Sequence, residues 1–240
     1  MYTKIKEEFE RIVEEHNLSK ETVMIRAKPL TPDEAIGNPE SEDFPILKGH
    51  ERLMQAEVRG CFGQAFTDMY GNFDGTLQDV LNMELDNNFK RAIFIATLNA
   101  VMRSLGMIEG SVHCKDSGPE ECGKELFEFL KQYDRSRIAL IGFQPVHARY
   151  CSKGHELKIL DLDKDNIGNE KFGVIVQDGS QNLEDVLKWC DLALVTGTTV
   201  VNGTIGPILE MAPQKVVYYG ISIAGVAKLF DLNRFCPKST

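Results

Sequence analysis

The sequence predicts two domains of mixed class: an α+β domain over residues 1–119 and an α/β, Rossmann-like domain with a mostly parallel sheet over residues 120–240. In the first half, strand-like runs come first and an apolar helix follows them, an order typical of α+β domains. From Glu120 onward, strands rich in β-branched residues alternate with helices, which predicts a parallel sheet covered on both faces. With 240 residues, 42% of them hydrophobic, the chain can build a sizeable core without disulfide bonds.

An amphipathic helix opens the first half, because Ile5, Phe9, Ile12 and Val13 recur at helical spacing within residues 3–16. After it we expect a strand at 22–30, an acidic proline-rich loop at 32–45 and two short strands within 53–66. A short helix at 77–85 and a longer helix at 86–105 are expected next. The longer helix has Asp86 or Asn87 as its N-cap and is apolar on nearly every face. We therefore expect it to be buried on most sides.

Helices and strands alternate through the second half. We expect its helices at 121–133, after residue 145, at 183–188, from residue 199 and at 223–230. The strands are expected at 137–141, 157–161, 174–176, 192–195 and 215–219. Because helices separate most of these strands, the strands can run parallel with their carboxyl ends at one edge of the sheet.

The charge balance argues against nucleic acid as a partner. The chain has 27 basic and 36 acidic residues, a formal net charge of −9, which opposes binding to a phosphate backbone. Residues 1–120 hold 13 basic and 21 acidic residues and residues 121–240 hold 14 and 15, so the second half can accept an anionic ligand with little repulsion. The absence of an apolar leader or of a long apolar run predicts a cytoplasmic protein that does not enter the membrane.

The six cysteines are expected to be reduced thiols in such a compartment. Cys61 and Cys190 lie in apolar surroundings and are expected in the core. Cys151 and His155, with His147 nearby, could bind a metal from one helix face, but a surface cluster is the simpler interpretation. Cys236 is expected to fold back on the sheet.

Ligands of an open parallel sheet bind beyond the carboxyl ends of its strands, where the strand order reverses. The first such loop is formed by Gly142, Phe143, Gln144 and Pro145, and it lacks the G-x-G-x-x-G pattern of dinucleotide-binding folds. At the end of the next strand, Asp161 lies 19 residues beyond Gly142. Its carboxylate could accept a ribose hydroxyl, or it could be a solvated acid at a strand end.

A third loop is rich in small and hydroxyl-bearing residues. Its members are Thr196, Gly197, Thr198, Thr199, Asn202 and Thr204. Small side chains let a ligand approach the backbone, and free N–H and hydroxyl groups can hold a phosphate or a carboxylate. We favour this function over ordinary helix capping, which the same residues could also serve. The loop at 220–225 is the weaker partner.

The junction between the predicted domains concentrates reactive side chains. His113, Cys114 and Cys122 could supply three soft ligands to a transition-metal ion, with Asp116 or Glu120 adding an oxygen. The spacing matches no standard zinc motif, so the cysteines could equally be buried thiols. Together with Asp116 and Glu120, Lys115 is a candidate acid-base group.

Several runs resemble a known family. Residues 110–123, 138–145, 190–204 and 234–237, together with 60–66 and 91–99, are similar to those of the heavy-metal chelation family of prokaryotic proteins. The resemblance implies a small domain like the amino-terminal domain of enolase, a Rossmann-like domain after it, and a cleft between the two. It also implies association with anaerobic metal or cobalamin-type metabolism, and it implies no reaction, since fold does not carry function. One departure is Gly220-Ile-Ser, where the family has a Gly-Thr-Thr-like run.

Three hypotheses follow from these residues. The leading one is a cytoplasmic protein that binds a metal ion, or a metal-bearing or anionic small molecule, in the interdomain cleft. The alternative is an enzyme that acts on a nucleotide-like or pterin-like molecule at the sheet edge. The third is a partner-binding protein with a vestigial site. The sequence leaves open whether the chain is an enzyme, and it is compatible with a homo-oligomer.

Overall fold

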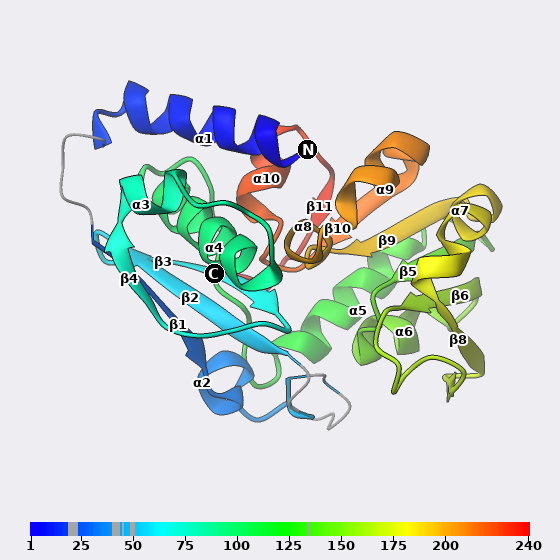
Figure 1. The fold of residues 1–240 in the computed structure, drawn as a ribbon. Helices are drawn as coiled ribbons and strands as arrows, with labels where there is room; N and C mark the ends of the chain where they lie inside the picture. The colour runs from blue at the N-terminus through cyan, green and yellow to red at the C-terminus, as the bar shows by residue number, and fades with distance from the viewer. Residues whose placement is uncertain (19–23, 40–43, 45, 49–50, 134) are drawn as a thin grey trace.

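The computed structural model describes residues 1–18, 24–39, 44, 46–48, 51–133 and 135–240. The described chain forms two β-sheets with helices on their faces (Figure 1). One sheet is antiparallel and belongs to the first half of the sequence. The other is mostly parallel and belongs to the second half, so the predicted mixed α and β class is confirmed.

The antiparallel sheet has the order β3-β2-β1-β4. Its strands are β1 (Met24–Leu30), β2 (Arg52–Val58), β3 (Cys61–Thr67) and β4 (Phe73–Thr76). The β2–β3 hairpin turns at Arg59 and Gly60, which both have a positive φ. The four-residue β4 was not expected from the sequence, because it is too short to show a pattern of alternation.

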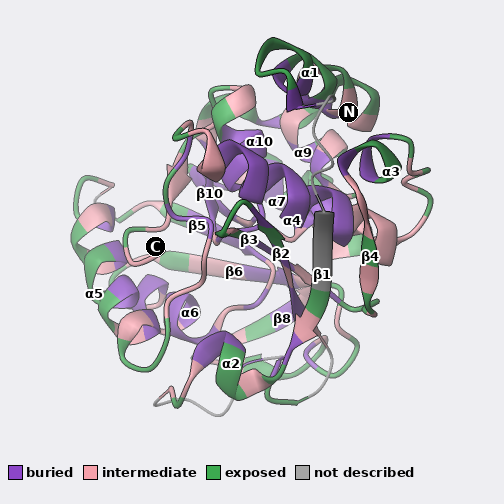
Figure 2. Cartoon of the chain, turned by 90° about the vertical axis from the view of Figure 1, so that its left-hand side faces the viewer, coloured by how far each residue is buried: buried purple, intermediate pink, exposed green. Residues whose placement is uncertain are grey.

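Helices cover one face of this sheet. They are α1 (Tyr2–Glu15), α3 (Leu77–Leu81) and α4 (Asn88–Ser104). The prediction for α4 is confirmed: the Asn87 side chain caps it by accepting from Lys90 N, and it is buried along its length (Figure 2). Gly63 lets α4 approach β3, since a Cβ there would lie 2.3 Å from the Ala96 carbonyl oxygen.

The loop expected at 32–45 is wrong in its first part, where α2 (Pro32–Ile36) forms. Thr31 accepts a hydrogen bond from Glu34 N while the Glu34 carboxylate accepts one from Thr31 N, a capping box that outweighs the loop signal of the prolines. Pro32 suits the first helical turn, where no backbone donor is needed. Residues 40–43 and 45 of the predicted loop, and residues 22 and 23 of the predicted first strand, lie outside the described residues.

The second sheet has the order β11-β10-β9-β5-β6-β8-β7, and all its pairings are parallel except that of β7 with β8. Its strands are β5 (Arg137–Ile141), β6 (Glu156–Asp161), β7 (Glu170–Lys171), β8 (Val174–Asp178), β9 (Leu192–Thr196), β10 (Val216–Tyr219) and β11 (Arg234–Phe235). From β5 the chain adds β6 and β8 on one side, then returns to add β9, β10 and β11 on the other. The strand order therefore reverses between β5 and β9.

Helices cover both faces of this sheet, as the parallel strands require. On one face lie α5 (Gly118–Leu130) and α6 (Pro145–Cys151). On the other lie α7 (Gly179–Trp189), α8 (Thr199–Asn202), α9 (Ile205–Met211) and α10 (Ala224–Leu229). The helix expected from residue 199 is in fact two, because Gly203 ends α8 with a left-handed φ of 88°. A 3-10 turn at Pro213–Lys215 precedes β10.

One hydrophobic core joins the two sheets. It contains residues of α1 and α4 together with residues of β9, β10 and α10. Polar contacts reinforce it: Tyr2 Oη donates to the Val200 carbonyl at 2.8 Å and Arg91 Nε to the Val201 carbonyl at 2.6 Å. In the described ranges, no helix combines the length and the apolar character needed to span a bilayer.

Asn99, buried in α4, links elements of both sheets. Its Nδ2 donates to the Gln64 carbonyl at 3.0 Å and the Ile221 carbonyl at 3.2 Å, and its Oδ1 accepts from Gly225 N at 2.8 Å. The side chain thereby holds α4 to β3 and to the segment between β10 and α10.

We predict that Asn99→Leu, which keeps the branching at Cγ and removes these bonds, lowers the free energy of unfolding by about 2–4 kcal/mol, because buried polar groups lose their partners. The matched control is Thr97→Val on the same helix, since the Thr97 hydroxyl is buried without a hydrogen-bond partner among the described residues. That change should leave stability equal or slightly higher. Urea unfolding of both variants measures the difference, and equal losses would contradict the role assigned to Asn99.

Candidate functional site

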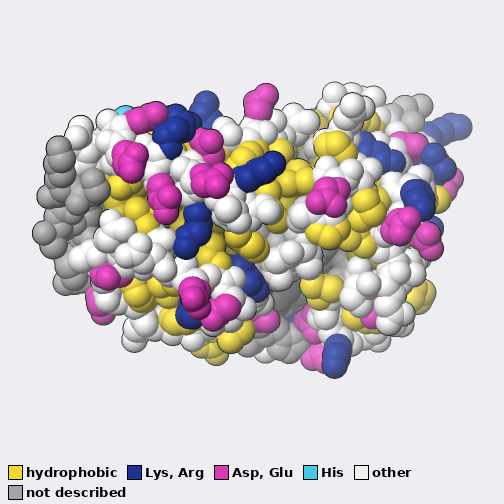
Figure 3. Space-filling view, turned by 45° about the horizontal axis from the view of Figure 1, so that its top comes forward, with side chains coloured by type: hydrophobic (Ala, Val, Ile, Leu, Met, Phe, Trp, Pro, Cys, Tyr) yellow, Lys and Arg dark blue, Asp and Glu magenta, His cyan; other side chains and the backbone are white. Residues whose placement is uncertain are grey.

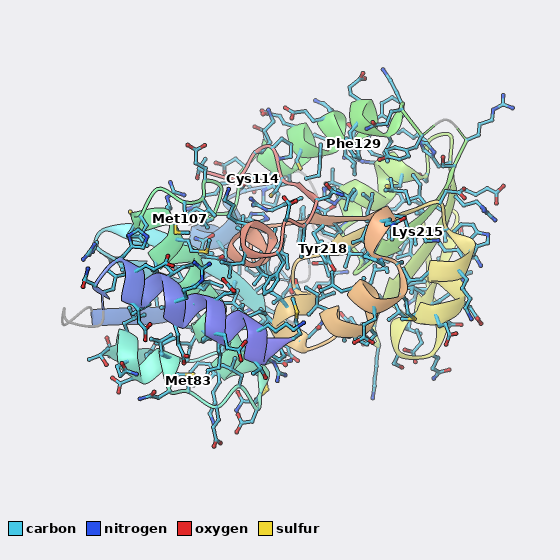
Figure 4. All side chains as sticks on the ribbon, turned by 90° about the horizontal axis from the view of Figure 1, so that it is seen from above. Met83, Met107, Cys114, Phe129, Lys215 and Tyr218 are labelled. Atoms are coloured by element: carbon cyan, nitrogen blue, oxygen red, sulfur yellow. The ribbon has the colours of Figure 1, made fainter. Side chains whose placement is uncertain are left out.

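A pocket of about 900 Å³ lies at the carboxyl edge of the parallel sheet. Its walls come from both halves of the sequence, from Ile36 and Phe66 on one side to Tyr219 and Cys236 on the other. Most residues predicted to bind a ligand line it: His113, Cys114, Cys122, Gly142, Phe143, Gln144, Asp161, Thr196, Gly197, Thr198, Thr199, Asn202 and Thr204. Figure 4 labels Cys114 in the middle of the molecule, between Met107 and Phe129.

The centre of the pocket lies where the strand order reverses, between β5 and β9. Gly142 ends β5 with φ 86°, and a Cβ there would lie 2.4 Å from Thr196 Cγ2, so only glycine allows the two strand ends to meet. Tyr219 Oη donates to the Gly142 carbonyl at 2.6 Å and holds the turn from β10. Gln144 caps α6 by accepting a hydrogen bond from His147 N.

The hydroxyl-rich loop after β9 is held by its own side chains. Thr196 Oγ1 and Thr198 Oγ1 share a hydrogen bond of 3.0 Å, and Thr199 Oγ1 donates to the Thr196 carbonyl at 2.8 Å. Asn202 Oδ1 accepts from both the backbone and the hydroxyl of Thr204. These hydroxyls rigidify the loop and present an ordered polar wall to the pocket.

Asp161 lines the pocket at the end of β6, and its carboxylate is already engaged. It accepts from Leu162 N at 2.7 Å, from Asp163 N at 3.2 Å and from Asn166 Nδ2 at 2.8 Å. Burial raises the pKa of this carboxyl, and the hydrogen bonds oppose that shift. The side chain orders its own loop, which leaves it less available to a ribose hydroxyl than a solvated acid would be.

His113 has the proton arrangement of a ligand-ready imidazole. Its Nδ1 lies 2.6 Å from the Cys114 carbonyl oxygen, and because a carbonyl only accepts, Nδ1 carries the proton. Burial lowers the pKa of His113 to about 4, so the ring is neutral at pH 7 and its Nε2 carries the lone pair. Gln64 Oε1 accepts from His113 N at 2.7 Å, and the Phe66 ring packs edge-on against the imidazole.

Cys122 and His147 face each other across α5 and α6. Cys122 Sγ lies 3.7 Å from His147 Nε2, and the two residues are 7% and 4% exposed. Burial raises the pKa of the Cys122 thiol and lowers the pKa of His147 to about 3, so both groups are neutral at pH 7. The His147 ring stands edge-on to Tyr219 with 4.6 Å between ring centroids.

Two further thiols complete a sulfur- and nitrogen-rich end of the pocket. Burial, with a smaller contribution from the nearby Cys236 thiol, raises the pKa of Cys114 to about 12. Cys236 and Cys114 act in the same direction on Cys122. We call His113, Cys114, Cys122, His147 and Cys236 the soft-donor cluster. Thiol and imidazole groups suit soft transition metals.

The side chains of this cluster are of the types that bind a soft metal ion, but their positions do not form a complete metal site. Over the described part of the chain, no group of three or more histidine, cysteine or acidic side chains is placed to hold one ion. His113, Cys114 and Cys122 share the pocket but do not converge on a ready three-ligand site. The pair with a direct contact is Cys122 with His147.

Charged side chains in the pocket wall are mostly acidic. Among the described lining residues, the carboxylates are Glu51, Asp68, Asp161 and Asp163, and the lysine is Lys164. This lining opposes a strongly anionic ligand and favours a cationic one, a balance that the near-neutral charge of the second half did not indicate. On the outer face shown in Figure 3, acidic and basic side chains are interspersed.

The remaining predicted residues lie away from the pocket wall. Asp116 and Glu120 line a separate cavity of about 100 Å³. Glu120 is paired there with Arg149 and accepts from Tyr150 Oη, so it serves the contact of α5 with α6. Lys115 and Pro145 line neither cavity.

The sequence interpretation missed His147 and Cys236 as members of this site. The surface cluster expected for Cys151 and His155, with His147 nearby, is wrong for Cys151 and His147, because these two are buried, at 0% and 4% exposure, whereas His155 is half-buried. The available signal was the apolar face of the short helix after Pro145, which places both residues toward the sheet. Cys236 does follow a strand that pairs with β10, and Cys190 is buried as expected.

Comparison with known proteins connects this geometry to a family. Residues 125–233 match the model of the DUF364 family, whose description is "Putative heavy-metal chelation". The resemblance noted in the sequence is thereby confirmed.

Two solved DUF364 structures share the fold. One, from Pyrococcus horikoshii, is 18% identical with a TM-score of 0.57, over 91% of this chain and 78% of that chain. The other, from Desulfitobacterium hafniense DCB-2, is 16% identical with a TM-score of 0.51, over 75% of this chain and 72% of that chain. Both are described as proteins of unknown function, and the likeness is one of fold. No curated protein matches the chain.

The two buried imidazoles predict a loss of stability in mild acid. An unfolded histidine takes up a proton near pH 6.5, whereas His113 and His147 resist protonation until about pH 4 and about pH 3. Stability is therefore present above pH 6.5 and falls as the pH falls below it, by up to about 1.4 kcal/mol per pH unit for each histidine.

Urea unfolding between pH 6.5 and pH 5 measures this slope. The His147→Gln variant should show a shallower slope than the wild type, while His16→Gln, at an exposed position, should not change it. A slope that is the same in all three proteins would contradict the burial of a neutral His147.

Proposed function

We propose that the chain binds a small molecule carrying a soft metal ion in the pocket at the carboxyl edge of the parallel sheet. The observation that carries this proposal is the convergence of the soft-donor cluster and the strand-end loops on one pocket of about 900 Å³. The volume is in the range of small-molecule sites, and its mixture of apolar walls with a few polar groups is typical of them. The description of the DUF364 family agrees with a metal as part of the ligand.

The strand order supports a ligand with two chemically different ends. Cys236 follows β11 and Asp161 ends β6, with β10, β9 and β5 between them. Four strand spacings separate these ends by about 19 Å. The metal would lie at the soft-donor cluster, and the remainder of the molecule would extend past Gly142 and the hydroxyl-rich loop.

The alternative is an enzyme acting on a nucleotide-like or pterin-like molecule, and one observation supports it: Asp161 lines the same pocket. It is supported less well, because the Asp161 carboxylate serves its own loop and because Lys115, Asp116 and Glu120 lie outside the main pocket. A rise in melting temperature with a nucleotide, lost in Asp161→Asn, would favour this alternative.

The proposal also covers the wider architecture of the molecule. We place the pocket in an interdomain cleft, with a boundary near residues 119 and 120 and a first domain like the amino-terminal domain of enolase. A cytoplasmic location and a homo-oligomeric assembly remain parts of the proposal. The antiparallel sheet with α4 on one face is compatible with this description of the first domain.

The protein purified without oxygen and without added chelator is expected to carry about one equivalent of a metal-bearing small molecule. Native mass spectrometry with metal analysis measures both parts. His113→Ala and Cys114→Ala should each reduce the bound metal, whereas Cys61→Ser, a thiol outside the pocket wall, should retain it.

Ligand binding should also stabilise the fold, by about 2.7 kcal/mol when the free ligand is at 100 times its dissociation constant. Wild-type protein that contains no small molecule and takes up no metal, alone or with a chelator, would contradict the proposal.

A further inference from the structure

We infer that the chain supplies two ligands, Cys122 Sγ and His147 Nε2, to a soft metal ion and that the bound small molecule supplies the others. The pocket is then a receptor for a metal chelate, and the protein itself does not complete the metal's coordination. This inference rests on the proposed function, that the pocket binds a metal-bearing small molecule.

The spacing of the pair matches two ligands of one ion. Metal–sulfur and metal–nitrogen bonds of about 2.3 Å and 2.0–2.1 Å at a tetrahedral angle put the two donor atoms roughly 3.6 Å apart. The observed distance between Cys122 Sγ and His147 Nε2 is 3.7 Å. A soft cation could therefore sit between them without a change in the backbone.

The backbone around the pair is built for this close approach. Cys122 is followed by Gly123, and a Cβ on that glycine would lie 2.3 Å from Val146 Cγ1 and 2.6 Å from Tyr150 Cδ2. Any larger residue would force α5 away from α6 and separate the two donors. The Gln144 cap and the Tyr219 ring fix the His147 side of the pair.

The imidazole of His147 lacks a firm partner. It is 4% exposed, its Nδ1 has no hydrogen-bond partner among the described residues, and its Nε2 has only the long contact to a thiol. Buried polar groups are normally paired by hydrogen bonds, because an unpaired one loses its hydration without compensation. His147 lines the pocket, and its Nε2, which makes only this long contact among the described residues, is the nitrogen available to a ligand there.

The chain does not complete the coordination shell. Within the described ranges no third histidine, cysteine or acidic side chain is placed to join a common ion. The pair opens on a pocket of about 900 Å³, far larger than an ion needs. A metal ion held by two protein ligands keeps open coordination positions, and the pocket has room for an organic chelator that fills them.

The walls indicate the class of that chelator. Aromatic and aliphatic side chains, among them Phe44, Phe66 and Phe143, can contact an apolar organic body. The carboxylates of Asp161 and Asp163 at the far end favour positive charge. The fitting ligand is a neutral or cationic metal complex of a nitrogen- or oxygen-donor organic molecule, extended enough to reach from the soft-donor cluster toward β6.

The test uses Co²⁺ as the probe metal and 2,2′-bipyridine as the probe chelator, with the full-length reduced protein. Absorption from thiolate-to-Co²⁺ charge transfer reports coordination by cysteine. We expect weak binding of Co²⁺ alone, and at least tenfold tighter binding of Co²⁺ when an equimolar amount of bipyridine is present. A protein that chelates the bare ion by itself shows the opposite, because bipyridine then competes for the metal and weakens its binding.

Variants assign the ligands. Cys122→Ser should abolish the charge-transfer absorption, and His147→Gln should weaken binding of the Co²⁺–bipyridine complex at least tenfold. Cys61→Ser should match the wild type. Circular dichroism confirms that each variant is folded.

Three results would overturn the inference: competition by bipyridine, failure of bipyridine to tighten binding, or charge-transfer absorption that survives in Cys122→Ser. The native mass spectrum of the purified protein tests the proposed function separately. A chain that carries a metal-bearing small molecule but fails the Co²⁺ test overturns only the two-ligand assignment.

Discussion

The hydrogen bonds of Asn99 are the constraint on which the rest of the molecule depends. Asn99 is fully buried in α4, where its donors and its acceptor need partners to offset their lost hydration, and these partners come from β3, from the turn after β10 and from the start of α10. The matching sets the position of the parallel sheet relative to α4. From there the constraint passes through Gln64, whose carbonyl accepts from Asn99 and whose side chain accepts from His113 N.

The candidate site combines low polarity with groups that could carry charge. The imidazoles of His113 and His147 and the thiols of Cys114 and Cys122 are neutral because burial penalises their charged forms. A neutral cluster is stable without a ligand, yet a cation at the same place would favour the thiolate form. The acidic side chains elsewhere in the wall also favour the binding of a cation, because their negative charges attract it. The electrostatics and the donor chemistry of the site thus agree on a cationic occupant.

Patterns that depend on neighbours in sequence were predictable. The alternation of strands and helices after Glu120, the buried helix with its Asn87 cap and the glycine turn at Gly142 all follow from local composition, and the structure contains each of them. The rule that ligands gather beyond the carboxyl ends of parallel strands correctly grouped most of the predicted ligand-binding residues in one pocket.

Features that depend on tertiary contacts were not predictable in this way. The contact of His147 with Cys122 could not be predicted locally, because it depends on the packing of α5 over α6, which is permitted by Gly123, 24 positions earlier in the chain. The partners of Asn99 lie in segments distant in sequence, so its role could not be read from α4 alone. The small α2 was missed for a different reason: three prolines and five acidic residues in 32–45 are typical of a solvated loop, although the capping box at Thr31 favours a helix.

The residues of the pocket wall are spread along most of the chain, so the wall is complete only after both sheets have formed. The wall begins at Ile36 and ends at Cys236, and both sheets contribute to it. No fragment that contains only one sheet can therefore present the complete wall. A ligand that needs this wall distinguishes a finished molecule from every partly folded form, in which the same thiols exist but lack their surroundings. A ligand bound in the pocket therefore indicates that both sheets have folded and packed together.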